Sequence, residues 1–238
     1  MDVERAPIEP TESLYLVALL PPSNIGRVVG ELQAELFRRH RLISALGLGV
    51  FLPLAFSQSP PPQPHRGLRG SADLLTQAGS LKTGGIVMAP TPNRGSAAET
   101  GKALYVDVVG GGSLEEATAE GAPRSVPWLD ELRASFPAGR GLFPLHSGLF
   151  LADLTELTAR AAAGEATKPK GGAGEPGELP APGLAVELSA LPPPPPLSWA
   201  ISELVCFALR FGQASSWWSL LEYETIWSVR LRRARSHD

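Results

Sequence analysis

The sequence predicts an α+β protein of two pseudo-symmetric lobes, each an antiparallel sheet with helices outside it, and a cleft between the lobes. The first observation is an internal repeat, because a strand–helix–strand pattern at 14–57 returns at 104–152. A repeat of this kind is typical of two lobes related by a pseudo-twofold axis. The second observation is a pair of apolar, aromatic segments at 199–211 and 217–231, which predicts a closing hairpin.

Composition narrows the class of protein. The chain has 238 residues and a net charge of −3, so it can bury a core and offers no bulk charge for nucleic acid or membrane. The only cysteine, Cys206, excludes an intrachain disulfide and a cysteine-based metal cluster. The N-terminus lacks the basic segment of a signal peptide, and the longest apolar run, 42–56, is too short for a span. We expect a cytoplasmic monomer without metal or cofactor.

The first repeat unit begins with an apolar run at 14–20, as expected of a buried strand. Two prolines end it, and Ser23 or Asn24 is expected to cap a helix over about 25–39. Apolar residues recur in that helix at helical spacing. A second strand follows at 50–57, where Pro53 predicts an edge position or a bulge because it removes a ladder donor.

The second unit is preceded by a strand at 81–89, in which two adjacent glycines predict a turn or bulge. It then contains a strand at 104–109, a helix at 127–136, a strand over 141–153 and a helix at 154–163. On the strand over 141–153, His146, Gly148 and Phe150 share one face, since strand side chains alternate.

The remaining segments have linker-like compositions. Residues 1–12 are predicted to form a disordered tail, ahead of a single two-lobed domain over 13–238 with a flexible insertion at 165–196. A short helix at 71–77 and a short strand at 186–191 are also expected. The proline-rich stretches 59–64 and 192–196 predict stiff, polyproline-like segments.

Two stretches carry a resemblance to a known family. The opening LYLVALLPPSNIGRVVGELQAEL and the closing SWAISELVCFALRFGQASSWWSLLEYETIWSVRL resemble the first strand, double proline, first helix and final hairpin of the two-histidine phosphoesterases. This superfamily contains the 2′-5′ RNA ligase-like (LigT-like) proteins and cyclic phosphodiesterases. The resemblance covers most of the chain except 1–12 and 165–196. It implies a hydrolase whose partner is an RNA end or a cyclic nucleotide.

The family carries His-x-Thr or His-x-Ser on one strand of each lobe. One imidazole takes a proton from the attacking oxygen, the other gives one to the leaving oxygen, and the hydroxyls hold the phosphate. In the first lobe of this chain, Phe51 stands at the histidine position and Pro53 at the hydroxyl position. In the second lobe, His146 is aligned with the histidine and Gly148 with the hydroxyl. The resemblance therefore implies a degenerate site.

Within that site, His146 is the candidate catalytic residue, and Phe51 occupies the position of its partner. Ser147, one residue from the hydroxyl position, and Arg140, ahead of the strand, are candidate substrate-binding residues. Three functions stay open: a pseudoenzyme that binds a nucleotide or RNA end, a weak 2′,3′-cyclic phosphodiesterase using His146, and a protein-interaction module that presents the proline-rich loops.

Overall fold

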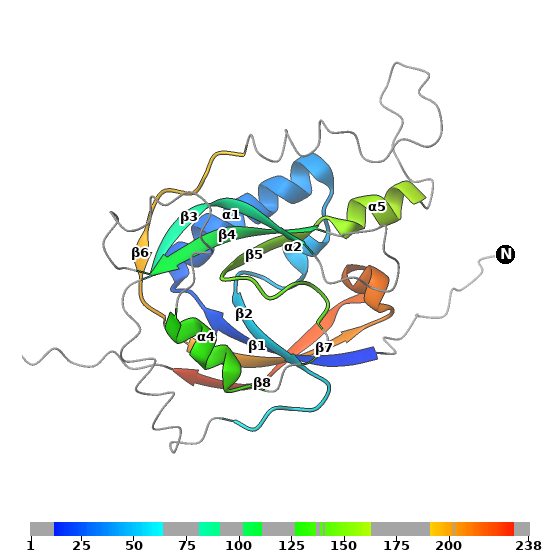
Figure 1. Ribbon diagram of the computed structural model, residues 1–238. Coiled ribbons are helices and arrows are strands. Elements are labelled where there is room, and N and C mark those ends of the chain that lie inside the picture. The colour runs from blue at the N-terminus through cyan, green and yellow to red at the C-terminus, as the bar shows by residue number, and fades with distance from the viewer. Residues whose placement is uncertain are drawn as a thin grey trace, which may run out of the picture.

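The two predicted lobes are two separate antiparallel sheets of four strands. The structure is a computed structural model that describes residues 12–63, 81–90, 102–110, 127–136, 139, 141–162, 191–201 and 203–230. The sheets have the strand orders β2-β1-β7-β8 and β5-β4-β3-β6 (Figure 1). Their strands are β1 (Glu12–Leu20), β2 (Leu52–Ser57), β3 (Leu81–Pro90), β4 (Lys102–Gly110), β5 (Gly148–Asp153), β6 (Ser198–Trp199), β7 (Glu203–Phe211) and β8 (Glu222–Arg230). The predicted α+β class and its two lobes are confirmed.

The helices lie outside the sheets. Three of them coincide with the helices predicted at 25–39, 127–136 and 154–163, and the other two were not predicted. They are α1 (Ser23–His40), α2 (Ser44–Gly47), α4 (Pro127–Ala134), α5 (Thr155–Ala162) and the 3₁₀ helix η2 (Ala214–Leu220). The predicted side-chain cap of α1 is wrong. Pro22 is the N-cap, and its carbonyl accepts the N–H groups of Ile25 and Gly26 at 3.0 Å. None of the helices in the described ranges has the length and apolar character to cross a bilayer.

The two predicted strand irregularities are confirmed. Strand β2 lies at the edge of its sheet, and its pairing with β1 shifts register so that Leu54 is the extra residue beside Pro53. Strand β3 shifts register between Thr83 and Ile86, where the two glycines lie. A strand donor lost to proline and two residues without a Cβ are the local causes.

The predicted strand over 141–153 is wrong in its first half. Strand β5 begins at Gly148, so His146 precedes the strand instead of lying in its middle. Residues 141–147 form a loop that passes close to β2, because a Cβ on Gly141 would lie 2.3 Å from a ring carbon of Phe56. This loop buries Leu142 and Phe143, at 4% and 1% exposure, and leaves Leu145 40% exposed.

The closing hairpin is confirmed as the antiparallel pair β7–β8. Trp217 and Trp218 lie in η2 between the two strands and not on a strand. The predicted tail (apart from Glu12), the helix at 71–77, the strand at 186–191 (except Leu191) and Arg140 lie outside the described residues.

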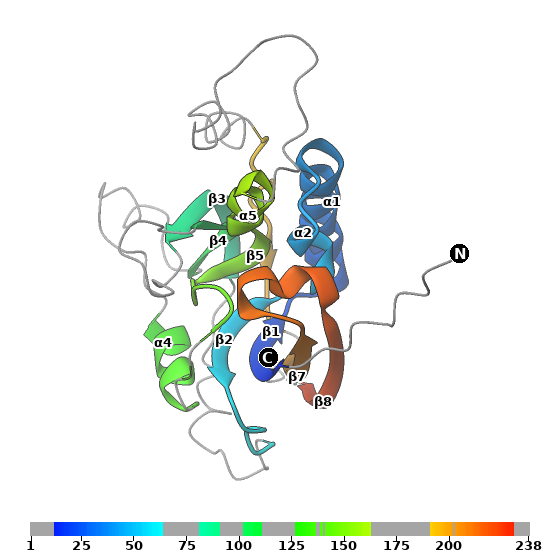
Figure 2. The ribbon, with the colours of Figure 1, turned by 90° about the vertical axis from the view of Figure 1, so that its right-hand side faces the viewer.

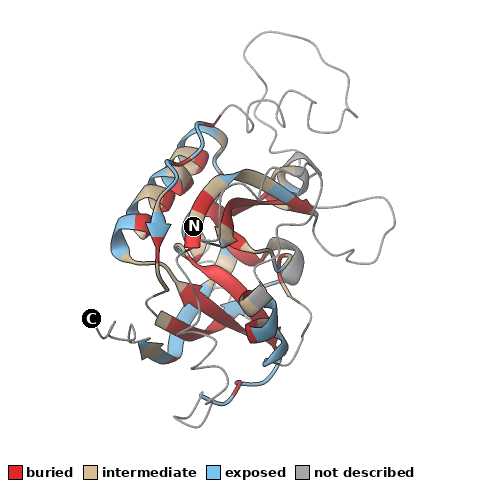
Figure 3. Ribbon diagram, turned by 60° about the vertical axis from the view of Figure 1, so that its left-hand side comes forward, coloured by how far each residue is buried: buried red, intermediate tan, exposed pale blue. Residues whose placement is uncertain are grey.

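The core has two parts, one on each side of the strands. The first lies under α1, α2 and α4 and is mainly aliphatic, with β2 contributing Leu52 and Leu54 and β5 contributing Leu149 and Leu151. The second is rich in aromatic side chains and includes η2. Figure 3 shows the buried strands at the centre and exposed residues along the outer side of the helices.

Candidate functional site

The edges of the two sheets meet where β2 and β5 lie side by side, as Figures 1 and 2 show. The N–H of Phe150 donates to the carbonyl of Phe51 at 3.0 Å, which joins the two lobes directly. These are the strands expected to carry the catalytic motifs. The contact between them is therefore the place to test the predicted site.

The strand registers decide which residues of the two lobes are equivalent. Each motif strand has one bulge against its neighbour, at Leu54 in β2 and at Leu151 in β5. Matching the bulges pairs 51–56, FLPLAF, with 148–153, GLFLAD. The equivalent of Phe51 is then Gly148, two residues after His146.

The two halves of the core support this equivalence. Leucines and alanines at matching positions of FLPLAF and GLFLAD pack in the aliphatic half, and Phe51 and Phe150 pack in the aromatic half. The alignment of Phe51 with His146 is therefore corrected. The shared Leu-x-Leu-Ala pattern was the sequence signal for it. With this correction, Phe51 and Gly148 stand at the positions that the resemblance assigns to histidines, and Pro53 and Phe150 at those it assigns to hydroxyls.

Aromatic rings fill the space between the two motif strands. Phe51 and Phe150 stack with ring centroids 5.7 Å apart. Phe143, from the loop before β5, lies 4.4 Å from Phe150, 5.0 Å from Phe56 and 5.6 Å from Trp217. We call these five residues the aromatic cluster. All five are almost completely buried.

Two polar side chains cross between the lobes beside the aromatic cluster. Gln33 of α1 donates from Nε2 to the carbonyls of Phe150, at 3.1 Å, and Gly49, at 3.0 Å. Arg133 of α4 donates from Nη2 to the carbonyl of Pro53 at 3.2 Å. Pro53 and Phe150 are equivalent in the two strands. Each lobe thus sends one helix side chain to the same backbone position of the other lobe.

Arg133 also holds the segment that contains His146. Its Nη2 donates to the His146 carbonyl at 2.6 Å, and its Nη1 donates to the Ser147 Oγ at 3.0 Å. It forms an ion pair with Asp130 at 3.6 Å. Both terminal nitrogens of this guanidinium are therefore engaged by the protein. The sequence did not single out Gln33 or Arg133, because the groups to which they donate hydrogen bonds are more than ten residues away.

The His146 imidazole lies over Gly148 and against Tyr105, with ring centroids 5.0 Å apart. Its Nδ1 is buried and has no hydrogen-bond partner among the described residues. A Cβ on Gly148 would lie 3.1 Å from this nitrogen and 2.7 Å from the Val106 carbonyl oxygen. The imidazole therefore takes the space beside Gly148, the position equivalent to Phe51.

The surroundings favour a neutral imidazole. Burial lowers the pKa of His146, and the positive charge of Arg133 acts in the same direction, while Asp107 opposes the shift. Burial also lowers the pKa of Arg133 and raises that of Tyr105. A neutral imidazole can accept a proton, but the equivalent strand offers Phe51 in place of a proton donor.

A buried polar network on the other side of the junction was also not predicted. The Asp153 carboxylate accepts the Trp217 indole N–H at 3.0 Å and the Thr155 N–H at 3.0 Å. The Glu156 carboxylate accepts the first N–H groups of α2, from Ile43 and Ser44, at 2.8 and 2.9 Å. An aspartate before a helix is a recognisable cap signal, but its indole partner is not visible in the sequence.

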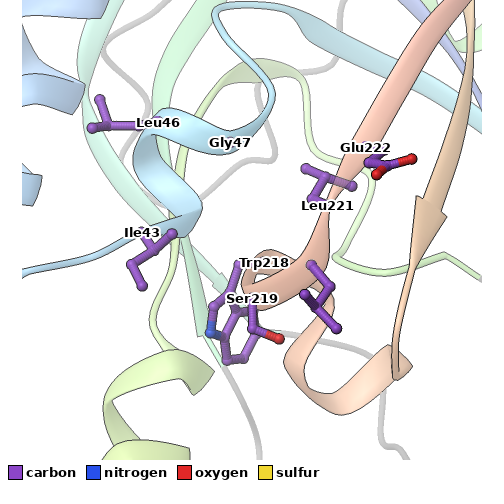
Figure 4. Close-up of a pocket in the computed structure, with 8 residues that line it drawn as sticks. Ile43, Leu46, Gly47, Trp218, Ser219, Leu221 and Glu222 are labelled. Carbon is purple, nitrogen blue, oxygen red and sulfur yellow. The ribbon is translucent and has the colours of Figure 1, made fainter. Parts of the chain in front are cut away.

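A hollow elsewhere on the molecule lacks the groups for phosphoester chemistry. It measures about 400 Å³ and lies between α2 and η2, lined by apolar side chains such as Ile43, Leu46 and Trp218, with Glu222 at its rim (Figure 4).

Burial raises the pKa of the Cys206 thiol to about 11, so this residue stays protonated. Within the described ranges, no group of three or more His, Cys, Asp or Glu side chains is placed to hold a metal ion.

Comparison with solved structures finds the chain similar to E. coli LigT. The LigT structure complexed with 3′-AMP has 14% identity and a TM-score of 0.40, covering 94% of this chain and 100% of that one. The structure complexed with NADP⁺ has 13% identity and a TM-score of 0.41, with 94% and 99% covered. A structure described as a phosphoesterase has 12% identity and a TM-score of 0.39, with 94% and 100% covered. No protein-family model and no curated protein matches the sequence.

Proposed function

We propose that this chain is a pseudoenzyme of the two-histidine phosphoesterase type, which keeps the two-lobed scaffold and has lost phosphoester turnover. The observation that carries the proposal is the position of Phe143. Its ring lies between the two motif strands, in contact with rings from both. A phosphate at that position would have to displace a buried aromatic side chain.

The proton-transfer groups lead to the same conclusion. Two-step phosphoester cleavage needs one group that accepts a proton and another that donates one. His146 is the single imidazole at the junction of β2 and β5 in the described residues, and the opposite strand presents Phe51. Loss of one proton-transfer group typically costs about 10²- to 10⁴-fold in rate. Loss of the hydroxyls that hold the phosphate adds to that cost.

The test is hydrolysis of a 2′,3′-cyclic nucleotide by the purified chain and by His146→Ala. We expect both rates to equal the uncatalysed background. His40→Ala, at the end of α1, is the matched control for removal of an imidazole away from the junction. Robust hydrolysis that persists in His40→Ala and disappears in His146→Ala would contradict the proposal and favour the weak cyclic phosphodiesterase.

Ligand binding without turnover is the second part of the proposal. His146 and Ser147 are half-buried and the neighbouring Leu145 is 40% exposed, so this edge of the junction reaches solvent. The ligand class implied by the resemblance is an RNA end or a cyclic nucleotide. Titration with an oligonucleotide ending in a 2′,3′-cyclic phosphate measures this, and Ser147→Ala should weaken the binding. If Ser147→Ala and His146→Ala both bind the oligonucleotide as tightly as the wild type does, this edge is not the binding site.

We place this function in a cytoplasmic monomer. The support is compositional, namely a single cysteine in the sequence. Size-exclusion chromatography with light scattering tests the monomer, and imaging of the tagged full chain tests the location.

A further inference from the structure

The second proline-rich stretch, 192–196, is held against the protein in a specific orientation. Proline fixes φ near −65° and disfavours helical conformations in the residue before it, so five consecutive prolines favour polyproline II. That helix has three residues per turn. Residues three apart therefore lie on one face.

Burial along the segment follows this period of three. Leu191 and Pro194 are buried and Leu197 is half-buried, which places one face of the helix on the protein. The two leucines pack on the aliphatic half of the core. The prolines between them, Pro192, Pro193, Pro195 and Pro196, are all exposed. The segment thus presents two adjacent edges, each with prolines three residues apart.

Thr83, at the bulge of β3, fixes the end of the segment. Its hydroxyl donates to the carbonyl of Pro195 at 2.8 Å and accepts the N–H of Leu197 at 2.8 Å. Its own N–H donates to the Leu197 carbonyl at 3.0 Å. Directly afterwards, Trp199 pairs with Leu81 as part of β6. The exposed prolines are therefore ordered before any partner arrives.

We propose that 192–196 is a docking segment for a partner domain with an aromatic-lined groove that binds polyproline II helices. Such grooves recognise Pro-x-x-Pro pairs and gain from a ligand that is already in the bound conformation. The segment offers two such pairs, Pro192 with Pro195 and Pro193 with Pro196. The first proline-rich stretch differs, because there the carbonyl of the buried Pro61 accepts the indole N–H of Trp227 at 3.0 Å. That stretch is already docked on an aromatic side chain of its own chain.

The experiment is titration of the full chain with purified SH3, WW and EVH1 domains, followed by calorimetry. We expect at least one of these domains to bind, and Pro192→Ala/Pro195→Ala to weaken that binding about tenfold or more. The matched control is Pro60→Ala/Pro62→Ala, which changes two exposed prolines of the other stretch and should bind like wild type. These prolines are exposed, so both variants should fold. No binding by any domain, or unchanged binding by Pro192→Ala/Pro195→Ala, overturns the proposal.

A second variant tests the anchoring itself. Thr83→Val keeps every exposed proline and removes the hydroxyl that holds the segment. We expect a loss of affinity of about threefold or more, because the partner must now order the segment. Thermal unfolding of the same variant verifies that the sheet persists. Unchanged affinity in a folded Thr83→Val chain would show that anchoring does not assist docking and overturn this part of the proposal.

Discussion

The two motif strands share a backbone frame and differ in what their inner faces carry. FLPLAF in the first lobe and GLFLAD in the second have the same bulge and the same aliphatic residues toward the helices. On the other face, the first lobe presents Phe51 and Phe56 and the second presents Gly148, Phe150 and Asp153. The helix-facing residues preserve the fold, since both lobes need the same packing there. The inner face is where the lobes have diverged.

The difference arises from what each strand has to accommodate. Strand β2 is approached by the loop 141–147, whose Phe143 packs against Phe56. Strand β5 follows directly after that same loop, and the His146 imidazole lies over Gly148. The second lobe therefore needs a residue without a side chain at the position where the first lobe has a phenyl ring. The asymmetric loop therefore accounts for the different residues at the two equivalent positions.

The largest expected effect comes from emptying the space between the lobes. Phe143→Ala should lower the free energy of unfolding by about 3 to 5 kcal/mol, because it leaves a cavity among buried rings. Urea denaturation followed by fluorescence measures it. Leu145→Ala, two residues away and 40% exposed, is the control and should change stability by less than about 0.5 kcal/mol. Equal effects of the two variants would show that the aromatic cluster does not hold the lobes together.

The difference between Phe51 and its equivalent Gly148 predicts the next largest effect on stability. Gly148→Ala should destabilise the chain by roughly 2 to 3 kcal/mol, because the new Cβ would lie 2.7 Å from the Val106 carbonyl oxygen. Gly85→Ala is the matched control, since a Cβ there meets nothing within 4 Å. The same denaturation experiment serves for both. A tolerated Gly148→Ala would mean that β5 can take a side chain at this position, and an imidazole could then be introduced at 148.

The crossing side chains test the pseudo-symmetry. Gln33→Met and Arg133→Met should each cost roughly 1 to 2 kcal/mol, because each leaves buried carbonyl groups without their donor. The equivalence of Pro53 and Phe150 predicts losses of similar size, although one side chain is neutral and the other charged. Glu31→Met, on the exposed face of α1, is the control. If only one of the two variants is less stable than the wild type, the two crossing side chains are not equivalent.

The smallest effect concerns the titration of His146. Its pKa is lowered in the folded chain, so below a pH of about 6.5 the unfolded chain binds the proton more tightly. Stability from this group is therefore present above that pH and is lost as the pH falls. His146→Gln should reduce the drop in unfolding free energy between pH of about 7.5 and about 5.5. An identical drop in wild type and His146→Gln contradicts the neutral imidazole.

Much of the architecture followed from local patterns in the sequence. Continuous apolar runs gave the central strands, helical spacing gave α1, and Pro53 indicated the bulge at the edge of its sheet. The degenerate first motif was predicted in the same way, from Phe51 and Pro53 at the positions that the resemblance assigns to a histidine and a hydroxyl. Such features depend on residues only a few positions apart, which is why the sequence alone determines them.

Other features were decided only by the tertiary structure. Residues 141–147 are apolar enough for a strand, yet they form a loop that places the Phe143 ring between the lobes. That loop moves His146 off β5 and makes Gly148 the equivalent of Phe51. Hydrogen bonds to groups far away in the sequence decide the roles of the donors Gln33 and Arg133 and of the acceptor Asp153. Which sheet edges meet, and which rings fill the space between them, depends on contacts that no local pattern records.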